Sequence, residues 1–226
     1  MTQSQPFSGA ATEGYRERAA RQVPGLAGLH RMTTMLLAER MPASGRLLVL
    51  GAGGGLELEA FALAQPGWSF DGVDPSADML ASAAELAAPH GARIRLHEGY
   101  VEDAPEGPFD GATALLTFHF IAREARRATL EQLHRRLKPG APLVLAHISF
   151  PQTEPERSVW IARHVAYGAP DHTDPAALEG SREAIRSRLS ILAPEDEVAM
   201  LKAAGFTGIS QFYAALSFRG WVAYAG

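Results

Sequence analysis

The stretch LLVLGAGGGLELEAF, residues 47–61, decides the fold that we predict for this chain of 226 residues. A short apolar run, a cluster of glycines and an apolar segment with helical spacing predict a strand, a tight loop and a helix. Glycines allow the backbone to turn sharply and to approach a ligand closely. The N-terminus of the helix then offers free N–H groups and a positive dipole end to a polar or negatively charged group.

The spacing of the glycines narrows the choice of ligand. The dinucleotide fingerprint G-x-G-x-x-G would require glycine at position 56, where this chain has Leu56. The chain instead has Gly51, Gly53 and Gly55, for which a plain strand-to-helix turn is the alternative interpretation. The segment FDGVDPS, residues 70–76, places Asp74 at the end of the next predicted strand. An ionised carboxylate there can accept hydrogen bonds from both ribose hydroxyls of an adenosine.

These residues together resemble the class I AdoMet-dependent methyltransferases, whose cofactor loop has this glycine spacing. The resemblance continues through residues 109–120, 133–140 and 201–206, and so covers nearly the whole chain. It implies a Rossmann-like α/β fold, with a seven-stranded, mostly parallel sheet in the order 3-2-1-4-5-7-6, the last strand antiparallel, and helices on both faces. It also implies S-adenosyl-L-methionine (AdoMet) as cofactor and S-adenosyl-L-homocysteine (AdoHcy) as its product. No group of residues has a convincing metal-ligand spacing, so we predict no metal.

The rest of the pattern predicts a single domain, 1–226. Strands are expected at 46–50, 68–73, 92–97, 110–117, 142–149, 207–215 and 218–224, with 92–97 at the edge of the sheet because one of its faces is polar. Helices are expected at 12–23, 28–41, 56–65, 77–87, 123–137, 154–167, 174–189 and 194–204. The arginines of the helix at 123–137 are interpreted as a solvated outer face, with an anion-binding face as the alternative: Arg123, Arg126, Arg127, Arg135 and Arg136.

Two further segments are expected around the ligand. Residues 1–41 are predicted to be a helical cover over the mouth of the cofactor site, with capping of the sheet edge as the alternative. An insertion at 150–193 is predicted to lie on the substrate side. In an open α/β sheet the ligand lies beyond the carboxyl ends of the strands. The resemblance therefore implies these cofactor-binding residues: Gly51, Ala52, Gly53, Gly55, Asp74, Pro75, Met79, Tyr100, Val101, Glu102, Thr117 and Phe118.

Methyl transfer needs in-line positioning and, for an oxygen or nitrogen nucleophile, a base within reach. His119 and His147 are the candidate catalytic residues, because both lie near the ends of central strands and histidine can take a proton near neutral pH. A structural histidine is the alternative for each. Weaker candidates for a substrate pocket are His164, Tyr167, His172, Arg182, Tyr213 and Arg219.

The chain departs from the family pattern at two positions. Val49 stands where an acidic residue usually precedes the glycine loop, and Tyr100 stands where an acidic residue usually binds the adenine amino group. Glu102 or Asp103 could substitute for the second. These departures leave open a non-catalytic module that keeps the fold. A nicotinamide-dependent oxidoreductase is a weaker alternative because of Leu56.

The layout of the chain also resembles the carboxy-AdoMet synthase family that serves tRNA wobble-uridine modification. The likeness rests on residues 23–25, 35–40 and 212–222. Leu26, Tyr100 and Thr117 depart from that family, and its carboxylate-binding arginine falls on Arg182 only by an uncertain alignment. We therefore predict a methyltransferase that acts on a small molecule, with the synthase as the first alternative.

Composition limits the partners. The net charge of −4 argues against a general DNA-binding or anionic-membrane-binding protein. The absence of cysteine excludes disulfides, thiolate metal sites and a cysteine nucleophile. Residues 1–14 lack a signal-peptide pattern, and no apolar run reaches the roughly 18 residues of a membrane span. We expect a cytoplasmic protein with a small-molecule acceptor, and leave a homodimer open.

Overall fold

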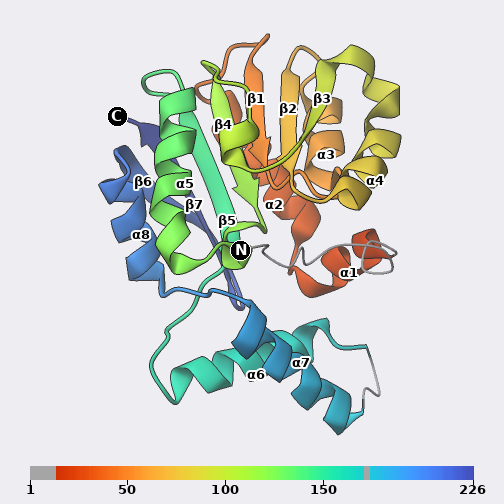
Figure 1. Cartoon of the computed structure of the whole chain (residues 1–226), viewed down its shortest axis with the longest axis vertical. Helices are drawn as coiled ribbons and strands as arrows, with labels where there is room; N and C mark the ends of the chain where they lie inside the picture. Colours follow the sequence, from red (N-terminus) through yellow and green to blue (C-terminus); the bar gives the residue numbers. More distant parts are fainter. Residues whose placement is uncertain (1–13, 171–173) are drawn as a thin grey trace.

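The computed structural model describes residues 14–170 and 174–226, which contain a seven-stranded sheet in the order β3-β2-β1-β4-β5-β7-β6 (Figure 1). Strands β1 to β5 pair in parallel, and β7 runs antiparallel to both β5 and β6. The predicted fold class, the strand order and the edge position of β3 are confirmed. The strands are β1 Arg46–Leu50, β2 Ser69–Asp74, β3 Ile94–Glu98, β4 Gly111–Leu115, β5 Pro142–Ile148, β6 Phe206–Ala215 and β7 Phe218–Ala225.

The α-helices begin and end close to the predicted positions. Ser76 caps α4 as its sequence position suggests, because its hydroxyl accepts a hydrogen bond from the backbone N–H of Met79 at 3.3 Å. Residues 12 and 13, where the first helix was expected to start, lie outside the described residues. None of the described helices is long and apolar enough to cross a membrane. The helices are α1 Tyr15–Gln22, α2 Leu26–Ala38, α3 Leu56–Ala64, α4 Ala77–Ala87, α5 Arg123–Arg136, α6 Glu156–Gly168, α7 Pro175–Arg188 and α8 Pro194–Ala203.

Helices cover both faces of the sheet. Successive side chains of a strand point to opposite faces, so β1 contributes to two hydrophobic clusters. Leu47 and Val49 pack in the cluster with α2 and α3, whereas Leu48 and Leu50 pack in the cluster with α5 and α8. The carboxyl ends of the parallel strands point toward α1, α6 and α7, which lie in the lower part of Figure 1.

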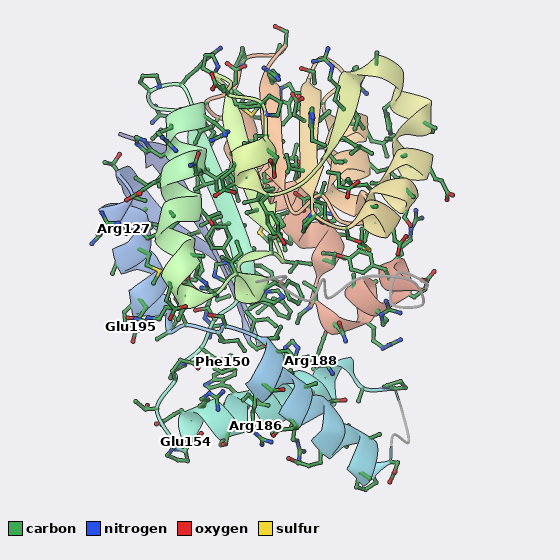
Figure 2. The ribbon with its side chains drawn as sticks, viewed as in Figure 1. Arg127, Phe150, Glu154, Arg186, Arg188 and Glu195 are labelled. Carbon is green, nitrogen blue, oxygen red and sulfur yellow. The ribbon has the colours of Figure 1, made fainter. Side chains whose placement is uncertain are left out.

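The inserted helices α6 and α7 pack against each other, and α6 also contacts α1. Phe150 is fully buried where the chain leaves β5, and its ring stacks on Trp160 of α6 with 6.3 Å between centroids. Figure 2 shows Phe150 between the sheet and the inserted helices. His164 of α6 lies 2.7 Å from the hydroxyl of Ser217, in the turn between β6 and β7. These contacts hold the insertion near the carboxyl end of β5.

The interpretation of α5 as a helix whose arginines are all solvated is wrong for two of them. Arg126 is fully buried and Arg136 nearly so. Arg126 pairs with Glu197 of α8 and donates to the backbone oxygens of Ile121 and Ser190. The cause is tertiary, because α8 packs on α5 and brings a carboxylate to a position 71 residues away in the sequence.

Glu197 is the centre of this buried polar network. Its Oε1 atom lies 2.9 Å from Nε2 of His147 and also pairs with Arg126. Burial alone favours the protonated carboxyl, but His147 and Arg126 together hold the pKa of Glu197 below its usual range. The network links α5, β5 and α8 near the carboxyl end of β5.

We expect Glu197→Ala to destabilise the fold by about 3–5 kcal/mol, because it leaves the buried guanidinium of Arg126 without its carboxylate. Chemical denaturation at pH 7 measures this loss. The matched control is Glu195→Ala in the same helix, where the side chain is exposed and labelled in Figure 2; we expect a change within about 0.5 kcal/mol. A similar loss of unfolding free energy in both variants would contradict the role of Glu197 as the buried partner of Arg126.

Candidate functional site

Backbone hydrogen bonds tie the glycine loop to the end of β2. The N–H of Gly51 donates to the carbonyl oxygen of Val73 at 2.8 Å, and the N–H of Gly53 donates to Oδ2 of Asp74 at 2.9 Å. The other carboxylate oxygen of Asp74 accepts from the N–H of Ser76 at 2.9 Å. The carboxylate therefore lies against the loop at the carboxyl ends of β1 and β2, where ligands of open α/β sheets bind.

Two of the loop glycines are required by close packing. Gly51 has φ 76°, and a Cβ atom there would lie 2.1 Å from Oγ1 of Thr117, after β4. Gly55 has φ 82°, and a Cβ atom there would lie 2.9 Å from Cα of Ala83 on α4. Side chains other than glycine would collide and would adopt a strained backbone at both positions. The loop is thus fixed between the end of β4 and α4.

Tyr15 of α1 reaches the same loop. A Cβ atom on Gly54 would lie 3.1 Å from Cδ1 of Tyr15, so the tyrosine ring packs directly on the glycine backbone. Burial, with smaller contributions from the carboxyl groups of Glu57 and Asp74, raises the pKa of Tyr15 to about 12. Sequence reasoning predicted a helical cover here but did not single out Tyr15. Tyr15 is thus a residue of the predicted cover, 1–41, that contacts the glycine loop directly.

Glu57, in the first turn of α3, is a second carboxyl group beside the loop. It is 7% exposed, and its Oε1 accepts a hydrogen bond from the hydroxyl of Thr113 at 2.9 Å. Burial raises the pKa of Glu57 to about 8; the Thr113 hydrogen bond opposes this shift and Asp74 adds to it. We did not predict this residue. Helical spacing could have found it, because it lies four residues before the buried Phe61.

The other predicted cofactor residues follow the carboxyl ends of β1 to β4, except Met79, which lies in the first turn of α4. Met79 is buried, and its Cε atom is 3.4 Å from where a Cβ of Gly53 would lie. Tyr100, after β3, is 48% exposed, and Val101 beside it is buried. Phe118 does not fit its predicted role, since its side chain is 1% exposed and packs in the core. The remaining members hold the predicted strand-end positions: Ala52, Pro75, Glu102 and Thr117.

The two candidate bases differ from what the sequence suggested. His147 has a fully buried side chain that pairs with Glu197 and stacks on Phe118, so it does not fit a base that must reach a substrate proton. His119 is also buried, and its Nδ1 accepts from the N–H of Ile148 at 3.5 Å. Burial, followed by His147, holds the pKa of His119 well below its usual value. It is therefore neutral at pH 7.

Most of the predicted substrate residues hold the elements around the site in place. The Tyr213 hydroxyl donates to the carbonyl oxygen of Pro24, between α1 and α2. Arg219 donates to two backbone oxygens of the β6–β7 turn at 2.7 Å, and Arg182 pairs with Glu179 on α7 at 2.9 Å. His164 anchors α6 as described above, and burial lowers its pKa to about 4. Tyr167 is exposed, and His172 lies outside the described residues.

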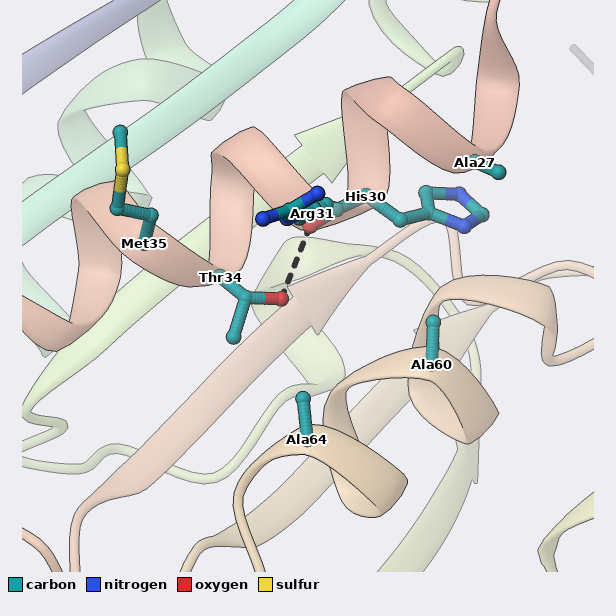
Figure 3. Close-up of a pocket in the computed structure, with 7 residues that line it drawn as sticks. All are labelled: Ala27, His30, Arg31, Thr34, Met35, Ala60 and Ala64. Atoms are coloured by element: carbon teal, nitrogen blue, oxygen red, sulfur yellow. Dashed lines mark hydrogen bonds between the residues drawn. The ribbon is translucent and has the colours of Figure 1, made fainter.

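Two pockets lie apart from the glycine loop. One of about 390 Å³ lies between α2 and α3 (Figure 3), where the hydroxyl of Thr34 donates to the backbone oxygen of His30 at 2.9 Å. The other, of about 790 Å³, lies beside α8, β6 and β7 and is lined by Trp160, Lys202 and Arg219 among others. Neither is lined by a loop glycine. Residues 14–170 and 174–226 contain no group of three His, Asp or Glu side chains that could hold a metal ion.

Comparison with known proteins gives one matching family. The sequence model of a family described as "Methyltransferase domain" matches residues 48–143. A carboxy-S-adenosyl-L-methionine synthase from Dichelobacter nodosus is 30% identical over 104 residues, 46% of this chain and 42% of that enzyme. The chain thus spans less than half of that relative. A carboxy-S-adenosyl-L-methionine synthase from Campylobacter lari is 21% identical over 96% of this chain and 93% of that enzyme.

Solved structures share the fold at low sequence identity. A phosphoethanolamine N-methyltransferase 2 from Haemonchus contortus, in complex with phosphomonomethylethanolamine and AdoHcy, matches with a TM-score of 0.68 and 14% identity, over 96% of this chain and 58% of that chain. Human N-acetylserotonin methyltransferase in complex with AdoMet matches with a TM-score of 0.56 and 17% identity, over 98% of this chain and 60% of that chain. At these identities the likeness shows the fold alone.

We expect Glu57→Gln to remove a pH dependence of stability. The carboxyl has a pKa of about 8 in the folded state, above its ordinary value of 4.5, which applies to the unfolded state. The folded state therefore holds the proton over pH 4.5–8 while the unfolded state loses it, and stability falls as the pH rises through that window. Glutamine keeps an acceptor for Thr113 but does not ionise. At pH 8 the variant should be more stable than the wild type by as much as about 4 kcal/mol, and similar at pH 5.

Urea denaturation from pH 5 to pH 8 measures this difference. The matched control is Glu59→Gln, two residues further along α3, where the side chain is only half-buried. It should change little with pH. An equal free energy of unfolding for Glu57→Gln and wild type at every pH would contradict the assignment.

Proposed function

We propose that this chain, a member of the class I AdoMet-dependent methyltransferase superfamily, transfers a methyl group from AdoMet to a small-molecule acceptor. The observation that carries the proposal is the position of Asp74. Its carboxylate is hydrogen-bonded to the glycine loop at the carboxyl ends of β1 and β2. Each carboxylate oxygen has further acceptor sites, so both can still bind ribose hydroxyls.

The electrostatics of the loop favour AdoMet over a dinucleotide. Two carboxyl groups, Asp74 and Glu57, lie beside the loop, and burial is the largest cause of the raised pKa of each. Further negative charge is therefore unfavourable at this place. A pyrophosphate would bring two negative charges, whereas AdoMet, with its sulfonium, ammonium and carboxylate groups, is a net cation. This argues against the nicotinamide-dependent alternative, in agreement with Leu56 at the position of the required glycine.

The residues of the chain would bind and orient the reactants. AdoMet supplies a methyl group on sulfur, which an acceptor nucleophile attacks in line while the carbon–sulfur bond breaks and AdoHcy leaves. The protein contributes positioning and exclusion of water. Tyr15 covers the loop from α1, while α6 and α7 lie beyond the carboxyl ends of the strands. These elements cover the loop and the carboxyl ends of the strands, which supports a small-molecule acceptor. Neither His147 nor His119 fits a general base, because both are buried and burial holds the pKa of His119 well below its usual value.

A carboxy-AdoMet synthase is the second candidate. The relative from Campylobacter lari that has this name matches along nearly its whole length. Against this candidate, Arg182, the position proposed for binding the extra carboxylate, pairs with Glu179 on the same helix. Tyr100 also replaces the acidic residue expected after β3. Mass spectrometry of ligand extracted from the purified protein separates the two candidates, because the carboxylated cofactor is heavier than AdoMet.

We expect Asp74→Ala to weaken the binding of AdoMet and AdoHcy by more than about tenfold, because each hydrogen bond to a charged group contributes about 1.5–3 kcal/mol. Isothermal titration calorimetry measures both affinities. The control is Asp78→Ala in the first turn of α4, where the carboxylate is exposed. It should bind like the wild type. Absence of binding to the wild type itself would overturn the proposal in favour of a non-catalytic module.

A further inference from the structure

The side chain of Glu57, in the first turn of α3, reaches the middle of β4 beside β1. Its hydrogen-bond partner, Thr113 of β4, is in register with Val49 of β1. Val49 lies two residues before the first loop glycine, Gly51. Thr113 and Glu57 are both buried, so the carboxyl group lies inside the molecule next to the loop. Its electrostatic influence extends to Tyr15, whose ring packs on the loop backbone.

The hydrogen bond from Thr113 does not require that residue 57 be able to carry a charge. Thr113 requires an acceptor, and a neutral amide such as glutamine would satisfy it equally well. A carboxyl adds the ability to carry negative charge, which is costly inside a protein unless a cation is near. Among residues 14–170 and 174–226, Glu57 forms no ion pair with a cationic side chain. Burial and the nearby carboxylate of Asp74 both raise its pKa. A cationic group of a ligand would supply the missing partner.

AdoMet offers such a cation, the α-ammonium group of its amino-acid part. Asp74 at the end of β2 is placed for the ribose, which fixes where the adenosine begins. Glu57 is hydrogen-bonded to β4, which borders β1 on the side opposite to β2. A cofactor that spans the loop from β2 toward β4 would carry its amino-acid part toward Glu57. The thioether product AdoHcy keeps the same ammonium group.

We propose that Glu57 binds the α-ammonium group of the cofactor, and that this binding releases a proton from the Glu57 carboxyl to solvent. The inference rests on the proposed function. No covalent bond changes in this step, because the carboxyl loses its proton as the ammonium arrives and the two form a buried ion pair. Glu57 is thus a positioning residue for the amino-acid part of the cofactor, and it makes affinity depend on pH.

The first experiment compares two ligands on the wild-type protein by calorimetry from pH 6 to pH 8. AdoHcy carries the ammonium group, whereas 5′-methylthioadenosine keeps the adenosine and the thioether but lacks the amino-acid part. We expect the Kd of AdoHcy to fall about tenfold to fiftyfold over this range, because the carboxyl must ionise on binding. The Kd of 5′-methylthioadenosine should change less than about threefold. Titrations in two buffers with different ionisation enthalpies should show proton release with AdoHcy alone.

The second experiment repeats the titrations on variants. Glu57→Gln should bind AdoHcy at least about tenfold more weakly at pH 8, with no pH dependence, and should bind 5′-methylthioadenosine as the wild type does. The matched control, Glu59→Gln, should behave as the wild type with both ligands. If Glu57→Gln does not fold, the buffer comparison on the wild type still tests the proposal.

The outcomes separate the two proposals. Absence of binding of both ligands to the wild type would overturn the proposed function itself. Binding of AdoHcy without proton release, or with an unchanged Kd in Glu57→Gln, would overturn the role of Glu57 and leave the cofactor site intact. Equal weakening of both ligands in Glu57→Gln would also overturn it, because a structural defect of the loop affects the adenosine as much as the amino-acid part.

Discussion

The attachment of the glycine loop to the end of β2 is the constraint on which the rest of the site depends. The loop donates backbone hydrogen bonds to Val73 and Asp74, and its glycines allow Thr117 and Ala83 to approach closely. These contacts bring the ends of β1, β2 and β4 to one place. A side chain at Gly51 would push the end of β4 away, and the carboxylate of Asp74 would lose its fixed position beside the loop.

Two buried glutamates of this chain have pKa values shifted in opposite directions, because their neighbours differ. Glu57 and Glu197 are both nearly inaccessible to solvent. Glu197 has Arg126 and His147 beside it, and these partners lower its pKa. Glu57 has a hydroxyl partner and a neighbouring carboxylate, and its pKa is raised. The first group completes its charge pairing inside the fold, whereas the second remains able to pair with a ligand.

The elements outside the sheet are held by polar contacts at a few points. The hydroxyl of Tyr213 holds the turn between α1 and α2, and the ring of His164 holds α6 to the turn between β6 and β7. Phe150 and Trp160 add an aromatic contact where the insertion leaves β5. Tyr213 and His164 were predicted to contact the substrate, whereas Phe150 and Trp160 were not predicted to have a role. Their observed contacts instead position the helices that enclose the strand ends.

Local patterns in the sequence determined each strand and helix to within a few residues, and the order of the strands followed from the resemblance to a known family. The glycine spacing located the loop, and the segment at 70–76 located Asp74 at the end of the next strand. These features depend on residues close together in the chain. Tyr15, Glu57 and the burial of Arg126 depend instead on contacts across 38 to 71 residues or on the packing of whole helices. Only the tertiary structure decided these, because the burial and charge partners of a side chain are set by the elements that pack on it and not by its sequence neighbours.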